Sequence, residues 1–562
     1  MQANHKPNDS KELAKELLAR TGSMEEARQP WESIWEQVSD YAGPEFKGFT
    51  TKNAHPHSPL DSIVDSTARR AAAVFSAGMQ SGASSPSQRW FMLQLQDKEA
   101  RDNPAAKAWV QQVEDGFYRD LSRFGYYAQQ HVCYHQTGLF GWQCLYLDEG
   151  VLQGLRFRSI PLHQVYIDES ATGEVDTTHR KLELTARQAA QFFGKENLPE
   201  GITKLLDKKS TDKITFVHQV FPAGDRKPVG GQRGSGLPFV SYYVCEGEEQ
   251  VISEGGFREM PYIITRAYRL PGTPYSYSPG TQALSDTKML NEMKALILEA
   301  GQMAMAPPYL VPDDGFVGRF SFEPRALNYY RKDKQGGGSP SDFMPMEVGG
   351  DPRFSWELLN ATKQDINEAF FVDLFMSIRR RVQEGTTPTA REVMELSEER
   401  MFLLGPMLVN QQRENFQRLF ERVFSLRMEQ GMLPPAPREM AGQELEVEYT
   451  SPLVLAQKES QTQAVLRTYQ ETGIIAQAAG PEVFDNFSHD KNVRRIMEQR
   501  GFPQEGMASE SDVAQIRQAR AQAQQREQEA AEAAELAKAM PAMGKRPEDG
   551  SPAQRMMEGE GS

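Results

Sequence analysis

The sequence predicts a mainly helical α+β protein, and three observations lead to that prediction. Two amphipathic helical segments, 281–305 and 356–381, enclose a stretch that is rich in proline and glycine. Between residues 141 and 270 apolar and polar positions alternate with a period of two, which is typical of strands. Residues 390–430 return to helical periodicity. Long helices are therefore expected around one strand-rich region.

Composition indicates a protein that buries part of its apolar surface against other copies. The chain has 562 residues, which exceeds what a single core usually serves, so several subregions are expected. Only 39% of the residues are hydrophobic and 25% are charged. The net charge of −14 has the wrong sign for tight phosphate binding, which depends on Lys and Arg displacing counterions. The acidity therefore argues against a static DNA binder.

Cysteine use and hydropathy indicate a reducing compartment and no membrane segment. Cys133, Cys144 and Cys245 are too few and too scattered for a disulfide framework. The first residues lack the apolar stretch of a signal peptide. No apolar run approaches the roughly 20 residues that span a bilayer.

The N-terminal third is expected to be helical before it becomes strand-rich. Residues 9–41 predict one or two helices, with Asp9 or Ser10 as N-cap and Pro30 restarting the run. A Thr185-x-x-Gln188 capping box predicts a short helix among the later strands. Further helices are expected at 61–80 and 104–122.

The central helical pair has an apolar face on each member. The first helix ends at Pro307 and Pro308, because proline lacks an amide and clashes with the preceding turn. The following residues, 307–354, contain seven glycines and seven prolines, which suits short strands and turns. The expected apolar faces consist of Leu290, Met293, Ile297, Ala300 and Ala304 on the first helix, and Leu359, Ile366, Phe370, Leu374 and Ile378 on the second.

The second helix of the pair ends in three arginines, Arg379, Arg380 and Arg381, before a short Gly/Thr loop. Thr389 and Glu392 form a capping box that starts the next helix. The arginines, together with Gln383, have two interpretations. They contact DNA phosphates, or they are a solvated helix end where cations meet the negative end of the macrodipole.

The C-terminal third is predicted to be helical with two interruptions. Gly405-Pro406 should kink the helix over 390–430, and Gly480-Pro481 should break the helical run 457–501. The segment from Ser511 to Met540 is rich in Ala and Gln, with few large apolar residues. It predicts either a helix that packs closely with copies of itself or a solvent-exposed single helix. Residues beyond 540 are expected to be disordered.

Motifs for catalysis and metal binding are weak. His131, Cys133 and His135 could hold zinc, but on a helix the cysteine points away from the two histidines, so a structural role is favoured. The sequence has no phosphate-loop motif, no H-E-x-x-H and no G-x-S-x-G. We therefore expect no enzymatic activity, no cofactor and no metal.

An ordered series of short motifs resembles the head-to-tail connector, or portal, proteins of short-tailed bacteriophages. The series begins at Trp31, Ile34 and Trp35 and runs to Leu453. Its members are Asp65-Ser66-Thr67, Pro86 with Trp90-Phe91-x-Leu93, Pro261-Tyr262, Tyr277-Ser278-Pro279-Gly280, Leu284-x-Asp286, Leu290-Asn291, Ala306-Pro307-Pro308, Thr389-Ala390-Arg391-Glu392-Val393, Leu404-Gly405-Pro406, Gly431-x-Leu433-Pro434 and Tyr449-x-Ser451-Pro452-Leu453.

The resemblance implies a portal fold with wing, stem, clip and crown regions that assembles into a ring. The implied regions are an N-terminal helical part of the wing (1–140), a strand-rich wing (141–280), stem helices (281–306 and 355–381), a clip (307–354), a tunnel loop (382–388), a kinked wing helix (389–433), a wing or crown segment (434–506), a crown or barrel helix (507–540) and a disordered tail (541–562).

The resemblance also implies a function and partners. A dodecamer at one capsid vertex of the virion, assembled in the host cytoplasm, would conduct double-stranded DNA during packaging and ejection. The terminase large subunit, tail adaptor proteins, the major capsid protein and scaffolding protein would bind it. The implied DNA-facing residues are Arg379, Arg380, Arg381, Gln383, Thr386 and Thr387, and those for partner docking at the clip are Asp313, Asp314, Arg331, Lys332 and Lys334.

Two other classes of protein are kept as alternatives. An internal virion or scaffolding protein built around the Ala/Gln-rich helices would form elongated or variable oligomers. A metal-dependent nuclease would use the histidine cluster and scattered carboxylates, and chelators would inhibit its cleavage of DNA.

Overall fold

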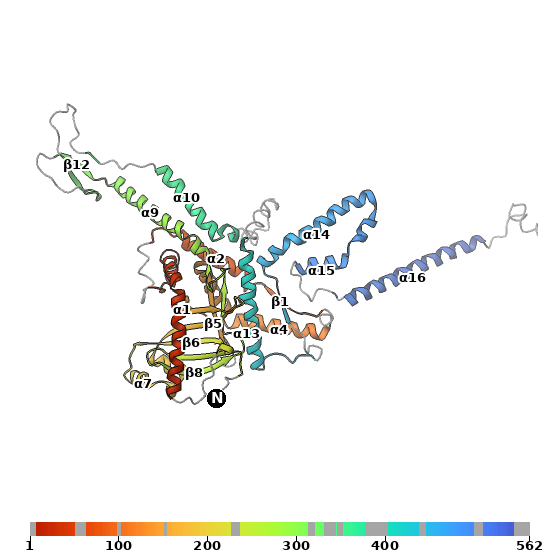
Figure 1. The fold of residues 1–562 in the computed structure, drawn as a ribbon. Helices are drawn as coiled ribbons and strands as arrows, with labels where there is room; N and C mark the ends of the chain where they lie inside the picture. Colours follow the sequence, from red (N-terminus) through yellow and green to blue (C-terminus); the bar gives the residue numbers. More distant parts are fainter. Residues whose placement is uncertain are drawn as a thin grey trace, which may run out of the picture. The chain divides into compact units, whose positions relative to one another are not determined.

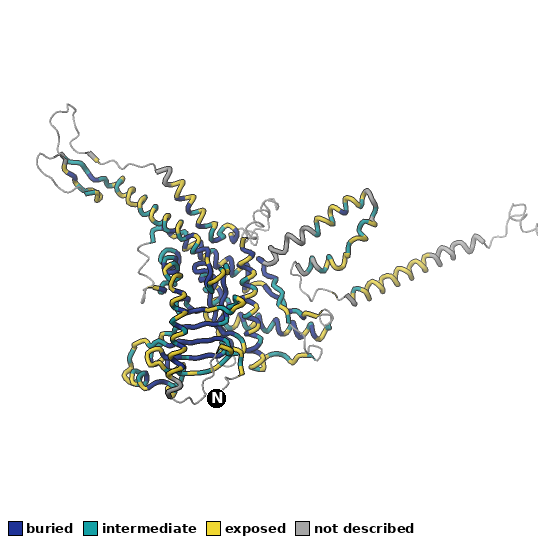
Figure 2. The backbone as a smooth tube through the Cα atoms, in the orientation of Figure 1, coloured by how far each residue is buried: buried dark blue, intermediate teal, exposed yellow. Residues whose placement is uncertain are grey.

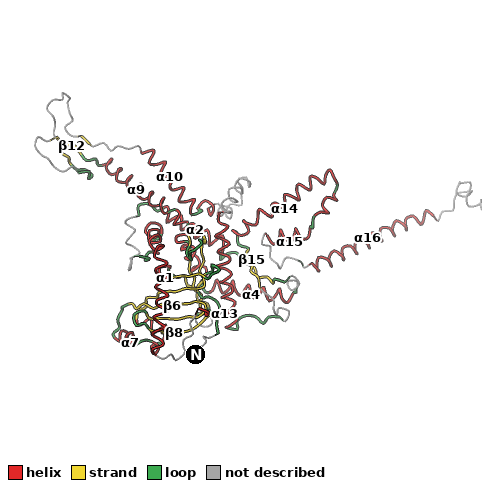
Figure 3. Tube along the Cα trace, viewed as in Figure 1, coloured by secondary structure: helices red, strands yellow, loops and turns green. Residues whose placement is uncertain are grey.

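The protein is described from a computed structural model, in which helices predominate and strands gather in several sheets (Figures 1 and 3). The chain divides into two compact units, Met1–Ala464 and Val465–Ser562. The structure describes residues 7–50, 63–97, 103–150, 154–225, 236–312, 321–330, 344–345, 352–376, 403–437, 445–499, 508 and 510–543. The predicted mixed α+β, mainly helical class is confirmed.

The first unit opens with one long helix, α1 (Pro7–Ala42). Pro30 lies inside α1 and does not restart it. Arg28 explains how the helix continues, since its guanidinium is 2% exposed and donates to the carbonyls of Leu162 and Val165 at 3.1 and 2.6 Å. Trp35, one turn beyond the proline, is fully buried. These long-range contacts on both sides of Pro30 offset the cost of a proline within a helix.

A five-stranded antiparallel sheet lies under α1 (Figure 1). The apolar side chains of Leu13 and Leu17 pack on Phe221 and Tyr242 of this sheet. The short helix predicted by the Thr185 capping box is present and follows directly after strand β5. In order across the sheet the strands are β4 (Val165–Glu169), β5 (Val175–Thr185), β6 (Lys213–Pro222), β7 (Phe239–Cys245) and β8 (Gln250–Phe257), with helices α6 (Ala186–Phe193) and α7 (Glu200–Asp207) between β5 and β6.

The largest core lies where helices cover a three-stranded sheet. The buried side chains there include Trp35, Trp142 and Tyr275, whose rings lie 5.2 to 5.8 Å apart. Figure 2 shows much of this region as buried. The elements are α2 (Thr67–Ala83), α4 (Pro104–Arg123), α5 (Tyr126–Phe140) and strands β3 (Leu155–Ser159), β2 (Trp142–Glu149) and β9 (Tyr262–Arg266). The helix expected at 104–122 is confirmed as α4, and the one expected at 61–80 is present as α2 but begins at Thr67 and ends at Ala83.

The central helical pair is present, and its second helix is shorter than predicted. Helix α9 (Leu284–Met305) follows the short α8 (Pro279–Gln282), and it packs against α10 (Pro352–Ala369). The prediction of one helix from 356 to 381 is wrong, because Phe371 has a left-handed φ of 56° and interrupts the helix. The interruption lets Phe370, Leu374 and Phe375 all enter the core. Between the two helices lies a small sheet of β13 (Leu327–Tyr330), β12 (Tyr309–Pro312) and β14 (Met344–Pro345).

A long helical segment runs from residue 403 to Glu429, and Gly405 and Pro406 lie within its helical turns. The structure describes this helix only from residue 403 onward, so the kink expected at Gly405-Pro406 stays a prediction. An irregularity comes later, as a π-helical turn, η7 (Gln411–Phe416), which precedes α13 (Gln417–Glu429). Buried contacts between η7 and strand β9 hold the π turn at this position.

Two chain segments that are far apart in sequence pair beside α13. Strand β1 (Phe91–Leu95) is antiparallel to β15 (Leu445–Tyr449), and Phe91 lies opposite Tyr449. A second two-residue pair joins β10 (Tyr268–Arg269) and β11 (Ser276–Tyr277).

The second unit is helical and contains the end of α14 (Pro452–Ala479), α15 (His489–Gln499) and α16 (Glu510–Met543). Gly480 and a short 3-10 turn at Pro481–Asn486 end the helical run after Ala479. This confirms the predicted break at Gly480-Pro481. Arg517 of α16 and Asp490 of α15 form two hydrogen bonds of 2.6 Å. Nearly every side chain described on α16 is exposed (Figure 2).

Candidate functional site

All residues predicted to face DNA or to dock partners lie outside the described part of the chain. The first group is Arg379, Arg380, Arg381, Gln383, Thr386 and Thr387, and the second is Asp313, Asp314, Arg331, Lys332 and Lys334. Their roles stay predictions. The structure does describe the elements on either side of them, the pair α9 and α10 and the helical segment after residue 402, and those elements define the candidate site.

The base of α9 is fixed to the N-terminal half by a polar contact. Asn291 accepts hydrogen bonds from the backbone amides of Val64 and Asp65 at 2.8 and 3.2 Å. Lys294, one turn further, donates to the Asp65 carboxylate at 3.1 Å. Burial alone would raise the pKa of Asp65, but hydrogen bonds from Thr67 and Lys294 outweigh it and hold the pKa below its ordinary value. Asp65 is therefore held ionised against α9.

The turn that precedes α9 is packed directly on helix α5. Ser278 caps α8 by accepting from the Thr281 amide at 2.8 Å, and its hydroxyl donates to the Leu139 carbonyl at 2.7 Å. At Gly280 a Cβ would meet that same carbonyl oxygen at 2.7 Å. Glycine is required at this position by the close approach of two backbones. The direction of α9 is consequently fixed at its first turn.

The outer part of the helical pair exposes apolar side chains. Leu290 is buried, while Leu296, Leu298 and Met305 of α9 are 57%, 52% and 84% exposed. On α10 Trp356 is 61% exposed. The predicted apolar face of α9 is thus buried only at its base, since Ala300 and Ala304 are exposed as well. Apolar side chains on two adjacent helices are characteristic of a surface that another protein chain covers.

The small sheet between the helices also presents apolar residues to solvent. Leu327 and Tyr329 alternate on β13 and are 50% and 40% exposed. The turn that leads into β13 is closed by Asn328, whose side chain bonds the backbone amide and carbonyl of Ser321, both at 2.7 Å. The Pro/Gly-rich excursion was predicted to form short strands, and the described part does so.

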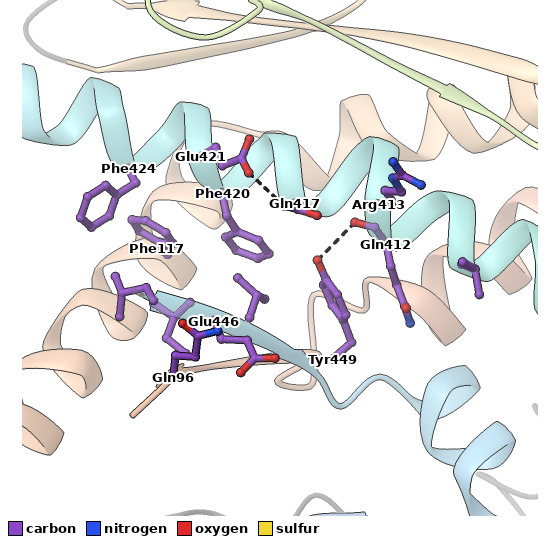
Figure 4. Close-up of a pocket in the computed structure, with 14 residues that line it drawn as sticks. Gln96, Phe117, Gln412, Arg413, Gln417, Phe420, Glu421, Phe424, Glu446 and Tyr449 are labelled. Atoms are coloured by element: carbon purple, nitrogen blue, oxygen red, sulfur yellow. Dashed lines mark hydrogen bonds between the residues drawn. The ribbon is translucent and has the colours of Figure 1, made fainter. Parts of the chain in front are cut away.

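A groove lies between α13 and the β1–β15 ribbon (Figure 4). Its volume is about 730 Å³, and Phe117, Phe420 and Phe424 form its apolar end. At the other end the Tyr449 hydroxyl donates to the Gln412 carbonyl of the π turn at 3.2 Å. Nothing in the sequence pattern singled out this groove, because its walls come from segments more than 300 residues apart.

The histidine and cysteine cluster does not form a metal site. Cys133 is fully buried and its thiol faces the Cys144 carbonyl at 3.9 Å, while the His135 ring packs on Phe46. Burial raises the pKa of the Cys133 thiol to about 12, so it stays protonated. Within the described residues no three His, Cys, Asp or Glu side chains are grouped to hold a metal ion. The structural role favoured from the sequence fits this packing.

Several of the motifs that carry the family resemblance lie in contact with one another. Asp65 lies beside Asn291, and Phe91 pairs with Tyr449. Leu453 packs on Gly82, where a Cβ would lie 2.6 Å from the leucine side chain. In the sequence these residues belong to separate motifs. In the structure they make contacts between elements that are far apart in the chain.

Among the helices that the structure describes, none is both long and apolar enough to cross a lipid bilayer.

Comparison with known proteins gives three findings. A family model described as "Bacteriophage head to tail connecting protein" matches residues 14–507. The chain is 29% identical over 508 residues to a "Probable portal protein" of Bordetella phage BPP-1, covering 89% of this chain and 90% of that protein. It is 28% identical over 514 residues to a "Portal protein" of Salmonella phage epsilon15, with the same coverage. Among solved structures, a chain titled "Neck of empty GTA particle computed with C6 symmetry" is similar with a TM-score of 0.32 and 12% identity, over 72% of this chain and 87% of that one.

Proposed function

Because this chain belongs to the family of bacteriophage head-to-tail connecting proteins, which are structural and not enzymatic, we propose that it forms the dodecameric portal ring at one capsid vertex. The observation that carries the proposal is the family match, which extends over residues 14–507. The mechanism is geometric. Identical subunits stand side by side around an axis through which double-stranded DNA enters during packaging and leaves during ejection.

Exposed apolar side chains on α9 and α10 support ring formation. Leu296, Leu298 and Trp356 are each more than half exposed in the single chain, where burial against a neighbouring copy would be favourable. Closed cyclic symmetry joins two different faces of each subunit, and the same pair of faces is repeated at every contact in the ring. In this proposal the stem consists of residues 281–306, which contain α9, and 355–381, which contain most of α10, and residues 307–354 are the clip.

The charge distribution supports a conduit in preference to a tight DNA binder. The net charge of −14 leaves DNA most of its counterions, so the wall offers few strong binding positions. A local contact would come from Arg379, Arg380 and Arg381 with the tunnel loop 382–388. These residues follow α10 in the chain and lie outside the described residues.

The partners follow from the position of each region in the proposed ring. The clip would bind the terminase large subunit during packaging and the tail adaptor proteins afterwards. The wing, which comprises the sheets under α1 and the segment 389–433, would contact the major capsid protein, with scaffolding protein present during assembly. The exposed helix α16 would form the crown or a barrel by packing against copies of itself.

Negative-stain imaging together with native mass spectrometry of the full chain tests the ring. We expect closed rings of twelve subunits with a central hole. Elongated or variable oligomers would favour the internal virion or scaffolding alternative, and solitary globules within mature particles would refute the portal assignment. Chelator-sensitive DNA cleavage would favour the nuclease alternative.

A triple substitution tests the DNA contact. Replacing Arg379, Arg380 and Arg381 with Ala should reduce packaged or retained DNA while rings still assemble. The matched control removes three exposed cations elsewhere in the first unit, Arg119, Arg187 and Lys204. Loss of rings in the first variant alone would make the three arginines structural.

A further inference from the structure

The π turn η7 contains one residue more than a regular α-helical turn would, and it lies within an otherwise α-helical segment. The amide of Gln417 donates to the carbonyl of Gln412, five residues back, where an α-helix would use the residue four back. Residues 403–410 before the turn and α13 after it are α-helical. A π turn is rare and occurs mostly as a single turn inside an α-helix, so contacts outside the helix are expected to hold it.

A buried ion pair holds the turn from one side. Glu414 is 6% exposed and accepts from the backbone amide of Arg266 at 2.8 Å and from its guanidinium at 2.7 Å. Arg266 is 1% exposed, and it also donates to Glu169 and to the Gly173 carbonyl at 2.8 and 2.9 Å. The bonds from Arg266 hold Glu414 against strand β9, and the bonds to Glu169 and Gly173 hold the Arg266 side chain in place. Breaking a buried pair on one side costs far more than an exposed pair, because the remaining charge is left without a partner.

The opposite side of the turn faces empty space. Val409, Gln412, Arg413 and Gln417 line the groove of about 730 Å³ described above (Figure 4). Several contacts hold the turn besides the ion pair. The Tyr449 hydroxyl donates to the Gln412 carbonyl, the buried Phe416 ring packs on Trp90 and Tyr449, and Arg413 donates to Glu174 at 2.6 Å. Close-packed protein leaves a helix no room to rotate, but here side chains of the turn have room to move.

We propose that η7 is a register latch, closed by the Glu414–Arg266 pair and released into the groove. When the pair opens, the turn tightens to α geometry. One residue of an α-helix corresponds to about 100° of rotation and 1.5 Å of rise, so residues 403–410 would turn and shift by about that amount relative to α13. The two arrangements differ in which side chains of 403–410 face the core.

The helix next to the latch follows the predicted DNA-facing residues in the chain. Residues 403–410 come directly after 377–402, which contain the arginines assigned to DNA contact, so a change in helical register would move the end of that segment at residue 402. This consequence rests on the proposed function. The latch itself does not, and it can be tested without DNA or capsid.

Hydrogen exchange of the full-length protein tests the ion pair. Glu414→Gln should speed exchange of the amides from 411 to 417 by about tenfold or more, since a hydrogen bond to a charged group is lost. Tyr449→Phe, a milder change on the groove side, should speed the same amides by a smaller factor. The control is Glu429→Gln, the same substitution at an exposed position at the end of the same helix, where the carboxylate contacts Arg258 and not the turn. Unchanged exchange at 411–417, or an equal rise throughout the sheet containing β9, would overturn the proposal.

Deletion of a single residue tests the inserted position. Removing Arg413, which is exposed within the turn, should give a continuous α-helix with both flanks in place and should leave the urea midpoint near the original. Removing Glu421, which is exposed in the regular part of the helix, should shift every later apolar side chain and lower the midpoint strongly. An equal loss in both deletions would show that η7 cannot tighten, and the latch would be refuted.

Discussion

Phe375 packs so closely on Gly78 of α2 that a Cβ on this glycine would lie 2.2 Å from the phenyl ring. The contact joins the turn after α10 to the N-terminal helices, and Phe75 adds an edge-on ring 5.8 Å from Phe375. The break in the second helix at Phe371 is what brings Phe375 to this place. A helical pair that carries an exposed apolar surface is thereby fixed at its base.

Gly78→Ala should lower the free energy of unfolding of the first unit by about 1–3 kcal/mol, because the added methyl forces Phe375 out of its position. The measurement is the urea midpoint of the full chain. The control is Gly116→Ala in α4, where nothing lies within 4 Å of a Cβ. Helix propensity should make that variant more stable by about 0.5–1 kcal/mol. A loss in the control equal to that at position 78 would contradict the packing argument.

Glu114→Ala should destabilise the first unit by about 2–4 kcal/mol. Glu114 is 4% exposed, and it accepts from the Leu93 amide at 3.0 Å and from Arg89 at 2.6 Å, so its loss leaves a buried amide unpaired. The matched control is Asp115→Ala, which removes the other carboxylate of Arg89 at an exposed position. That change should cost less than about 1 kcal/mol. Similar losses at both positions would show that burial of Glu114 is unimportant.

Acid should destabilise the five-stranded sheet through His179 and His218. Burial lowers the pKa of both imidazoles to about 3, with Arg20 adding to the effect at His179 and Arg180 at His218. The unfolded chain binds these protons near pH 6.5 and the folded chain does not. The neutral rings therefore contribute their full stabilisation of the folded state above about pH 6.5, and this contribution is lost as the pH falls toward 3.

Urea midpoints between pH 7 and pH 4 measure this dependence. His218→Gln removes the proton site, and Gln still offers hydrogen-bonding groups toward Tyr262 and Ser241, which lie 2.6 and 2.9 Å from the imidazole nitrogens. The slope of stability against pH should become shallower in this variant. His489→Gln, at an exposed position in the second unit, should leave the slope as it is.

Leu296→Glu combined with Leu298→Glu should prevent ring formation while the subunit stays folded. Both side chains are more than half exposed in the single chain, so the stability of the subunit should change by no more than about 0.5 kcal/mol per site. Charges placed in an apolar subunit contact would be desolvated without partners. Gln302→Glu, on an exposed position of the same helix, is the control for added charge. Rings that persist in the double variant would exclude both side chains from the subunit contact.

The sequence by itself determined the elements whose signals are local. Helix α9 follows from apolar spacing and ends before Pro307 and Pro308, and the capping box at Thr185 starts α6 as predicted. Such signals act between residues three or four apart, so they can be read before any tertiary contact is known. The ordered motifs also identified the family correctly, since they reach from Trp31 to Leu453 and the family model matches 14–507.

Tertiary structure alone decided how distant segments join. The continuity of α1 across Pro30 depends on Arg28 reaching the carbonyl of Val165, and the π turn depends on Glu414 reaching Arg266. Each of these contacts links residues more than 130 positions apart, where spacing in the sequence carries no signal. Buried charges must find partners wherever the fold brings them, and the resulting pairs override local preferences for a helix break or a regular helical turn.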